Sequence, residues 1–427
     1  MSLSNSWMKR VGAPLALAAF AACGGGVMNP DANDPGDQAP ARTGLPRALT
    51  SAERDVLSAS NRFSFSLWNT INQAQRDSNV FVSPLSASFA LGLMLNGASG
   101  TTYDEMRSAL QFGTASLPSI DSGYKSLIAL LTTLDPSTKM QIANAIFYRS
   151  GFPFNQSFLD DASKWFDAEV QAQNFGDAQG TLSAVNGWAS AKTNGRIPKV
   201  LDEVSSSAVM YLLNAIYFKG TWRDKFDPAK TIDAPFHPAT GGDQPAKLMS
   251  RQAKMAYAET PAFQAVDLPY GDSSFTMTVL LPKTGNSVES VAPSLTAESW
   301  QALTSSFHTQ EVALWLPKIT FSWKRKLIDD MKALGMRAAF VPDGADFTRM
   351  SSTMGTHLYV SLLQQNTFVA IDEEGTEAAA VTIGGVDVTS VPIVMQMRVD
   401  RPYIFVIRER LSGTVLFMGK IARLPAA

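Results

Sequence analysis

Hydrophobic positions after residue 50 recur at the spacings of helices and of strands. Phe63, Leu67 and Ile71 lie four residues apart, which predicts the buried face of one helix. This helix would begin at a capping box over residues 50–53, where threonine is followed three residues later by glutamate. Ser83, directly before a proline, predicts the start of a second helix after a short strand.

Further along, strand and helix patterns follow one another without a regular alternation. The hydrophobic run over residues 209–219 suits a buried strand. Strands are also expected over residues 140–148, 262–269, 275–281, 312–321, 403–409 and 414–421, and helices over residues 155–166, 181–193 and 324–334. This mixture favours an α+β fold. Although 427 residues could hold two or three domains, we expect a single large one over residues 50–427.

Composition removes several classes of function. A hydrophobic content of 45% with 17% charged residues is typical of a globular chain. The formal net charge of -2 argues against a nucleic-acid partner and against a polybasic membrane contact. Three histidines and one cysteine leave little for a metal site or a disulfide framework, so no cofactor is expected.

The pattern changes after the strand-like residues 368–371. Read as a strand, the following segment would carry only small or uncharged side chains on one face, and the charges of Glu377 and Asp387 on the other. The small face comprises Thr376, Ala378, Ala380, Thr382, Gly384 and Val386. Long loops without helical periodicity are uncommon in compact domains and are usually functional. This alternation suits a loop that later enters the middle of a sheet.

The sequence EEGTEAAAV, followed after the loop by RPYIFVIRERLSGTVLFMGKI, resembles the reactive-centre loop and C-terminal hairpin of the serpin family. The resemblance extends over residues 58–424. It implies the serpin fold, in which a large, mostly antiparallel central sheet has flanking helices, further sheets and an exposed reactive-centre loop. It also implies an inhibitor and not an enzyme. A target protease cleaves the loop, and the cleaved loop inserts into the sheet as a new strand, an established example of strand addition.

The resemblance gives roles to residues around the loop. A hinge at its start would comprise Glu373, Gly375, Thr376, Ala378, Ala379 and Ala380. A sheet-opening region would comprise Ser83, Ser86, Asn214, Gln365, Trp222 and Lys318. Within these sets, Ser83, Ser86, Asn214 and Gln365 would form a polar cluster under the sheet, and Lys318 would pair with Glu373. Gln365 stands where the family often has a histidine, which argues against pH-dependent opening through that position.

The reactive bond follows from the family's usual spacing. Sixteen positions after Glu373, the susceptible bond would join Thr389 to Ser390. The segment after Ser390 is about two residues longer than usual, so a bond one or two positions away remains an alternative. No lysine or arginine lies between Glu377 and Met397, which argues against a trypsin-like target. Val388 and Thr389, the residues before the bond, would suit a shallow apolar pocket, which favours elastase-like or subtilisin-like proteases. Papain-like cysteine proteases are a further class.

The N-terminus has the features of an export signal. Two basic residues precede an apolar run over residues 11–22 that is too short to span a bilayer. The sequence around Cys23 resembles a bacterial lipobox, so residues 1–22 are expected to be a signal peptide and Cys23 to carry a lipid. Ordinary secretory cleavage near Ala22 is the alternative. Residues 23–49, rich in glycine, proline and aspartate, would form a flexible tether.

These features predict where the protein resides and what it contacts. We expect export as an outer-membrane or cell-surface lipoprotein, or otherwise a periplasmic or extracellular location. The expected contacts are a covalent acyl complex with a target protease and a membrane contact through the lipid at Cys23. The inhibitor itself is expected to be a monomer.

The sequence offers two alternatives to a protease inhibitor. Ser122 and Lys125, together with Lys283-Thr-Gly285, match two of the three motifs of penicillin-recognising serine hydrolases. No Ser-Asp-Asn motif accompanies them, and the order of elements does not fit. The second alternative is a non-inhibitory serpin that acts as a binding or folding factor. Such relatives tend to have bulky or charged hinges, whereas this hinge is small.

Overall fold

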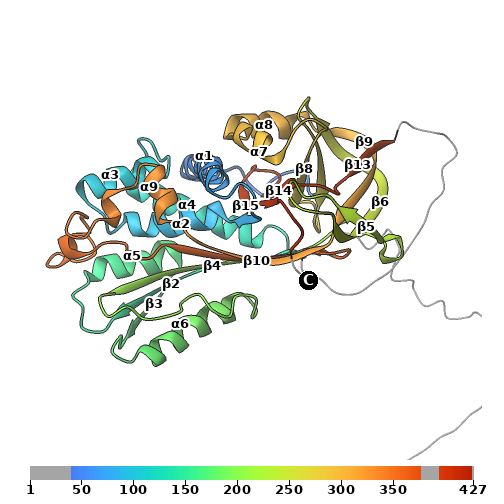
Figure 1. Cartoon of the computed structure of the whole chain (residues 1–427). Helices are drawn as coiled ribbons and strands as arrows, with labels where there is room; N and C mark the ends of the chain where they lie inside the picture. Colours follow the sequence, from blue (N-terminus) through green and yellow to red (C-terminus); the bar gives the residue numbers. More distant parts are fainter. Residues whose placement is uncertain (1–39, 377–393, 426–427) are drawn as a thin grey trace, which may run out of the picture. The chain divides into compact units, whose positions relative to one another are not determined.

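The computed structural model describes residues 40–376 and 394–425, and these residues form two sheets with helices around them (Figure 1). The α-helices are α1 (Ser51–Ala74), α2 (Pro84–Leu95), α3 (Gly100–Ala109), α4 (Leu117–Thr133), α5 (Gln156–Phe166), α6 (Ala178–Lys192), α7 (Val288–Val291), α8 (Ala297–Ser306) and α9 (Ile328–Ala333). The predicted α+β class is confirmed.

The first sheet, here called the main sheet, has the strand order β10-β11-β12-β4-β2-β3 in the described part of the chain. Its strands are β2 (Lys139–Arg149), β3 (Glu169–Gln173), β4 (Met210–Thr221), β10 (Ile319–Lys326), β11 (Gln364–Ile371) and β12 (Gly375–Thr376). Neighbouring strands are antiparallel except for β2 and β3, which are parallel. The sheet is therefore mostly antiparallel.

The second sheet has the order β1-β15-β14-β8-β7-β6-β9-β13, and β5 pairs with β6. Its strands are β1 (Val80–Val82), β5 (Ile232–Phe236), β6 (Gln244–Glu259), β7 (Phe263–Pro269), β8 (Phe275–Pro282), β9 (His308–Pro317), β13 (Met395–Arg398), β14 (Tyr403–Glu409) and β15 (Val415–Ile421). The predicted hairpins at residues 262–281 and 403–421 are confirmed as β7–β8 and β14–β15.

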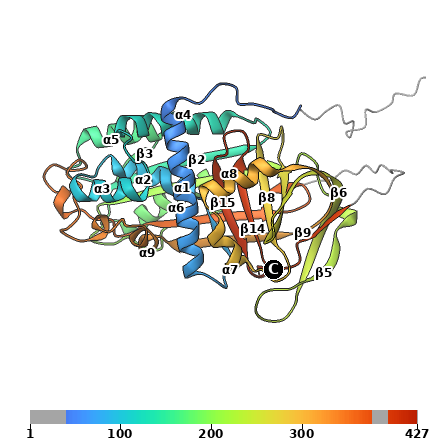
Figure 2. The same ribbon diagram turned by 90° about the horizontal axis from the view of Figure 1, so that it is seen from above.

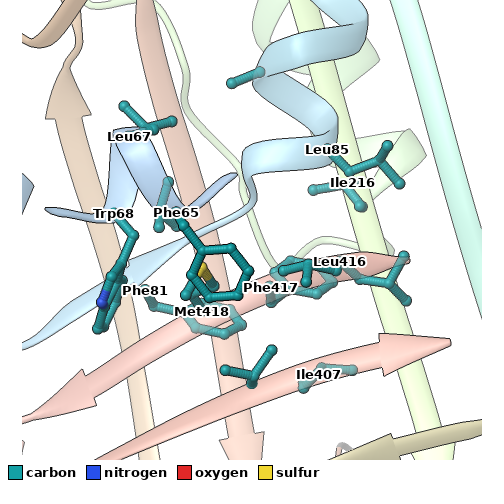
Figure 3. Packing of buried hydrophobic residues seen from close by; sticks show 14 of the residues in the cluster. Phe65, Leu67, Trp68, Phe81, Leu85, Ile216, Ile407, Leu416, Phe417 and Met418 are labelled. Atoms are coloured by element: carbon teal, nitrogen blue, oxygen red, sulfur yellow. The ribbon is translucent and has the colours of Figure 1, made fainter. Parts of the chain in front are cut away.

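The main core lies between the two sheets. Every residue of α2 is buried, as expected for a helix that is apolar on all sides, and α2 contacts both β4 and β15. Phe81 of β1 stacks on Phe417 of β15 with ring centroids 5.0 Å apart, and Trp68 of α1 lies nearby (Figure 3). Helix α1 crosses this core (Figure 2). On its other face the main sheet packs against α6, through Phe147 and Trp188 among others.

Local signals place the first two helices as predicted. The Thr50 side chain accepts a hydrogen bond from the Glu53 amide, and the Glu53 carboxylate accepts one from the Thr50 amide, so the capping box is formed. An ion pair with Arg47 at 2.6 Å lowers the pKa of Glu53 to about 2. Ser83 is the N-cap of α2, with Pro84 as its first residue.

The predictions for residues 312–334 were wrong in part. A strand was expected over residues 312–321 and a helix over residues 324–334, but the chain forms two strands, β9 and β10, and α9 is short. The two strands flank Lys318 and belong to different sheets. In β10, Ile319 and Trp323 are buried while charged residues alternate outward, and all eight residues pair with β11. Pairing with a distant strand therefore outweighs the helical preference of the lysines and arginine.

Residues 1–39 lie outside the described part of the chain, and with them the predicted signal peptide and Cys23. Within residues 40–376 and 394–425, no helix is both long and apolar enough to cross a membrane.

Candidate functional site

The start of the predicted hinge lies inside the main sheet. Strand β12, residues Gly375–Thr376, lies between β11 and β4 and pairs with both. Thr376 is opposite Ile371 of β11 and Gly220 of β4, and Gly375 is opposite Thr221. The hinge is therefore already seated as the first two residues of an additional strand.

Two glycines make this close approach possible. A Cβ atom on Gly375 would lie 2.1 Å from the carbonyl oxygen of Gly220 and 2.8 Å from Cα of Thr221. A Cβ atom on Gly220 would lie 2.6 Å from the ring of Tyr270. Both contacts are shorter than van der Waals separation permits, so neither position accepts a side chain without movement of the backbone or of the Tyr270 ring.

Tyr270 holds the hinge through a hydrogen bond between side chains. Its hydroxyl lies 2.6 Å from Oγ1 of Thr376, and both residues are buried. The Tyr270 ring stacks on Trp222 with centroids 4.5 Å apart and an interplanar angle of 13°. Burial raises the pKa of Tyr270, so the hydroxyl stays protonated and able to donate.

Trp222 holds the backbone of the hinge. Its indole Nε1–H donates to the carbonyl oxygen of Asp372 at 2.8 Å, and its amide donates to the carbonyl oxygen of Glu374 at 2.8 Å. The turn between β11 and β12 is closed by the Asp372 amide, which donates to the carbonyl oxygen of Gly375. Trp222 therefore stabilises this conformation of the hinge by hydrogen bonds to its main-chain carbonyl oxygens.

Two ion pairs flank this turn. Nζ of Lys318 lies 2.6 Å from Oε2 of Glu373, whose Oε1 accepts a hydrogen bond from Thr231. Burial alone would raise the pKa of Glu373, but the bonds from Lys318 and Thr231 outweigh it and hold the pKa below the usual value. Nζ of Lys225 lies 2.7 Å from Glu374. Each of these two hinge carboxylates is therefore anchored by a lysine.

The predicted polar cluster is divided into two groups, one around Gln365 of β11 and one around Asn214 of β4. Oε1 of Gln365 accepts from the Ser83 amide and its Nε2 donates to the Ser83 carbonyl, both at 2.8 Å. The Ser86 amide completes the group by donating to Oγ of Ser83. Asn214 instead donates to Asn144 at 2.8 Å, so the four predicted members do not form one network.

A cavity of about 120 Å³ separates the two groups. It lies over α2, and its walls include Met210, Leu212 and Asn214 of β4 and Gln365 of β11. Oδ1 of Asn214 is buried and has no hydrogen-bond partner among the described residues. In the same part of the chain, no register pairs β4 directly with β11, and β12 alone bridges them. Beyond Thr376 the described residues thus leave a gap in strand pairing between β4 and β11, with the cavity beside it.

A family model described as serpin (serine protease inhibitor) matches residues 58–424. The chain belongs to the serpin family. It is 30% identical over 390 residues to human Serpin B11, which covers 86% of this chain and 99% of the relative. It is also 30% identical over 376 residues to the leukocyte elastase inhibitor of Xenopus laevis, covering 86% of this chain and 98% of the relative.

A solved serpin structure has the same fold. The thermophilic serpin tengpin in its native state matches with a TM-score of 0.79 and 27% identity, covering 90% of this chain and 98% of tengpin. The predicted serpin fold is confirmed. The family is described as one of serine protease inhibitors and not of catalysts, so the chain is not an enzyme, and the hydrolase alternative is wrong.

Ser122 and Lys125, two of the residues that suggested a hydrolase, occupy ordinary positions in helix α4 of this serpin. Oγ of Ser122 donates to carbonyl oxygens of its own helix α4, at Pro118 and Ser119. Nζ of Lys125 donates to the carbonyl oxygen of Lys164. The serine and lysine therefore serve the packing of α4 and do not form a nucleophile and base.

Part of the predicted serpin site lies outside the described residues. These are the hinge alanines and the reactive bond, Ala378, Ala379, Ala380, Thr389 and Ser390. Conversely, sequence reasoning missed Tyr270, Gly220 and Asn144. Tyr270 follows a strand directly, at Pro269, but nothing in its neighbourhood indicates a partner 106 residues further along the chain.

Proposed function

We propose that this serpin is a suicide-substrate inhibitor of an endopeptidase. The observation that carries the proposal is β12, the seated hinge, which lies at the top of a gap between β4 and β11. A loop cleaved further along would extend β12 into this gap as a new central strand.

The registers of β12 favour a definite path for the loop. Continued by six residues, the pairing with β4 brings Thr382 opposite Asn214, and the pairing with β11 brings Thr382 opposite Gln365. Thr382 would share the face of Thr376, which is directed into the core. Its hydroxyl can then donate to the unpaired Oδ1 of Asn214, so insertion would satisfy a buried acceptor that is unpaired beforehand.

Inhibition depends on whether the cleaved loop inserts faster than water hydrolyses the acyl-enzyme formed with the target protease. The catalytic serine of the target attacks the carbonyl carbon of Thr389, the peptide bond to Ser390 breaks, and the new amine of Ser390 takes the proton and leaves. Insertion then carries the acyl-enzyme along the sheet before water can release it. Ordering each residue costs about 1–2 kcal/mol of backbone entropy, so strand pairing and burial must exceed that cost.

The proposal includes the target class and the location. An elastase-like or subtilisin-like enzyme fits the residues before Ser390, and a papain-like enzyme fits Val388 one position earlier. We propose export as a bacterial lipoprotein anchored through Cys23, with the part of residues 23–49 that precedes Arg42 as the tether and the rest of the chain as the inhibitory domain. The Xenopus laevis relative named leukocyte elastase inhibitor supports the elastase-like assignment.

Incubation with an elastase, a subtilisin, a trypsin and a papain tests the proposal. We expect a complex with at least one of the first two that survives boiling in detergent, and a released peptide that begins at Ser390. Mass spectrometry of that peptide identifies the bond. Cleavage in the loop by every active protease without any complex would overturn the proposal and favour a non-inhibitory serpin.

Thr382→Val tests the path of the loop. The substitution keeps the shape of the side chain but removes the donor for Asn214, and an unsatisfied buried acceptor costs about 1–3 kcal/mol. We expect the loop-cleaved variant to melt at a lower temperature than cleaved wild type, whereas the intact forms melt alike. Thr382→Ser, which keeps the hydroxyl, is the matched control. Equal melting of all cleaved forms would contradict the register.

A further inference from the structure

The chain just before α1 is bound to the domain and does not hang free. We call residues 42–49 the N-terminal strap; they lead away from the start of α1, in blue in Figure 2. Leu45 and Leu49 pack against the main core. Arg47 forms its ion pair with Glu53 and also donates to Ser126 of α4. The last part of the predicted tether thus belongs to the folded unit.

Arg42, at the N-terminal end of the strap, binds the turn between β7 and β8. The Arg42 amide donates to the carbonyl oxygen of Asp272 at 2.7 Å, and Nε of Arg42 donates to the Asp272 carboxylate at 2.9 Å. Arg410 donates from the same guanidinium to the carbonyl oxygens of Arg42 and Ser273. Arg42 is therefore bound to the turn between β7 and β8 directly, through Asp272, and also through Arg410, which bonds to both Arg42 and Ser273.

Arg42 is one of two partners of the Asp272 carboxylate, whose Oδ1 accepts a hydrogen bond from the Ser274 amide at 2.9 Å. Asp272 is only 7% exposed, and Oδ2 of a second carboxylate, Asp135, lies 3.2 Å from its amide. Within the described residues, Arg42 is the one cation that forms an ion pair with Asp272. An ionised carboxylate at such a position needs a countercharge, since an unpaired buried charge is strongly destabilising. The turn is thus fixed from outside by Arg42.

The inner side of the same turn carries the hinge contacts. The amide of Gly271, next to Asp272, donates to the carbonyl oxygen of Thr221 at the end of β4. Tyr270, one residue earlier, contributes the hydroxyl that meets Thr376 and the ring that stacks on Trp222. A single residue, Gly271, therefore separates the strap's anchor Asp272 from Tyr270, the side chain that holds the hinge.

We propose that Arg42 is a positioning residue for the hinge: by holding Asp272, it keeps Tyr270 where its hydroxyl reaches Thr376. A strap that is cut after Arg42, or pulled away from the domain, unseats Gly375 and Thr376 from the sheet. The structural coupling stands by itself, whereas its effect on inhibition rests on the proposed function. Whether the N-terminal strap is bound to the domain would then determine whether Gly375 and Thr376 are seated in the sheet when the loop is cleaved.

Hydrogen exchange of the full chain tests the coupling. The amides of Trp222 and Asp372 report the seated hinge, because their acceptors are Glu374 and Gly375. In Arg42→Gln we expect both amides to exchange at least tenfold faster than in wild type. Thr43→Ala alters the neighbouring exposed residue and should leave both rates unchanged. Arg42→Lys, which keeps the charge, should restore much of the protection.

The overturning result is equally definite. Unchanged exchange at Trp222 and Asp372 in Arg42→Gln, with faster exchange confined to the strap and to residues 271–274, would show that the strap does not position the hinge. For a trapped protease we also expect Arg42→Gln to raise the moles of inhibitor consumed per mole of complex severalfold, with the association rate unchanged. Absence of any complex with wild type would refute the proposed function and leave the exchange result to decide the coupling.

Discussion

Arginine in place of Thr376 is expected to turn the inhibitor into a substrate. The Thr376 side chain is 3% exposed and bonded to the hydroxyl of Tyr270, whose ring packs closely against Gly220. A guanidinium there would lose its hydration without gaining a carboxylate, at a cost of several kcal/mol. We expect the yield of boiling-stable complex to fall at least tenfold while the loop is still cleaved, as gel densitometry of complex and cleaved inhibitor would measure.

Two control variants separate the hinge from the loop in general. Thr376→Ser keeps a small hydroxyl for Tyr270 and should retain most of the complex. Glu377→Arg makes a larger change of charge one position later, on the alternate face that would be exposed after insertion, and should be tolerated. An unchanged complex yield in Thr376→Arg would contradict insertion from this hinge.

Cleavage of the loop without trapping is expected to stabilise the domain strongly. Extension of β12 would pair residues 377–386 with β4 on one side and residues 377–383 with β11 on the other, and would fill the cavity beside Asn214. A gain of several kcal/mol would raise the melting temperature on the order of 10 °C or more, since 1 kcal/mol corresponds to about 2–4 °C in domains of 150–250 residues. Differential scanning calorimetry of intact and cleaved protein measures the difference.

The control for this prediction is the cleaved form of Thr376→Arg, which should melt close to its intact form because the strand cannot start. A cleaved wild type that melts at or below the temperature of the intact protein would indicate that the loop stays outside the sheet. In that case the gap between β4 and β11 would have to serve another purpose.

Elements with a strong local pattern could be predicted from the sequence. The capping box at Thr50, the cap at Ser83 and the C-terminal hairpin all appear where expected, because each depends on residues within a few positions of one another. The ion pair between Lys318 and Glu373, which only the family resemblance suggested, lies at 2.6 Å.

Contacts between distant segments left no such local pattern. The division at Lys318 into two strands depends on pairing with β6 and β11, which lie elsewhere in the sequence. Asn214 bonds to Asn144 across neighbouring strands, 70 residues away, and not to Ser83. The contact of Arg42 with Asp272 spans 230 residues, and composition alone placed Arg42 in a flexible tether. In each case the partner is set by the packing of whole elements.

The seated pair Gly375–Thr376 also bears on how fast a loop can enter the sheet. Growth of an ordered segment is slow where the first contacts must be found and fast where each new residue adds to an existing one. Here the first contacts exist before any protease arrives, since Thr376 already has neighbours on both sides. Insertion would then begin as propagation, without a search, and we expect its delay after acylation to depend little on the length of the loop beyond the cut.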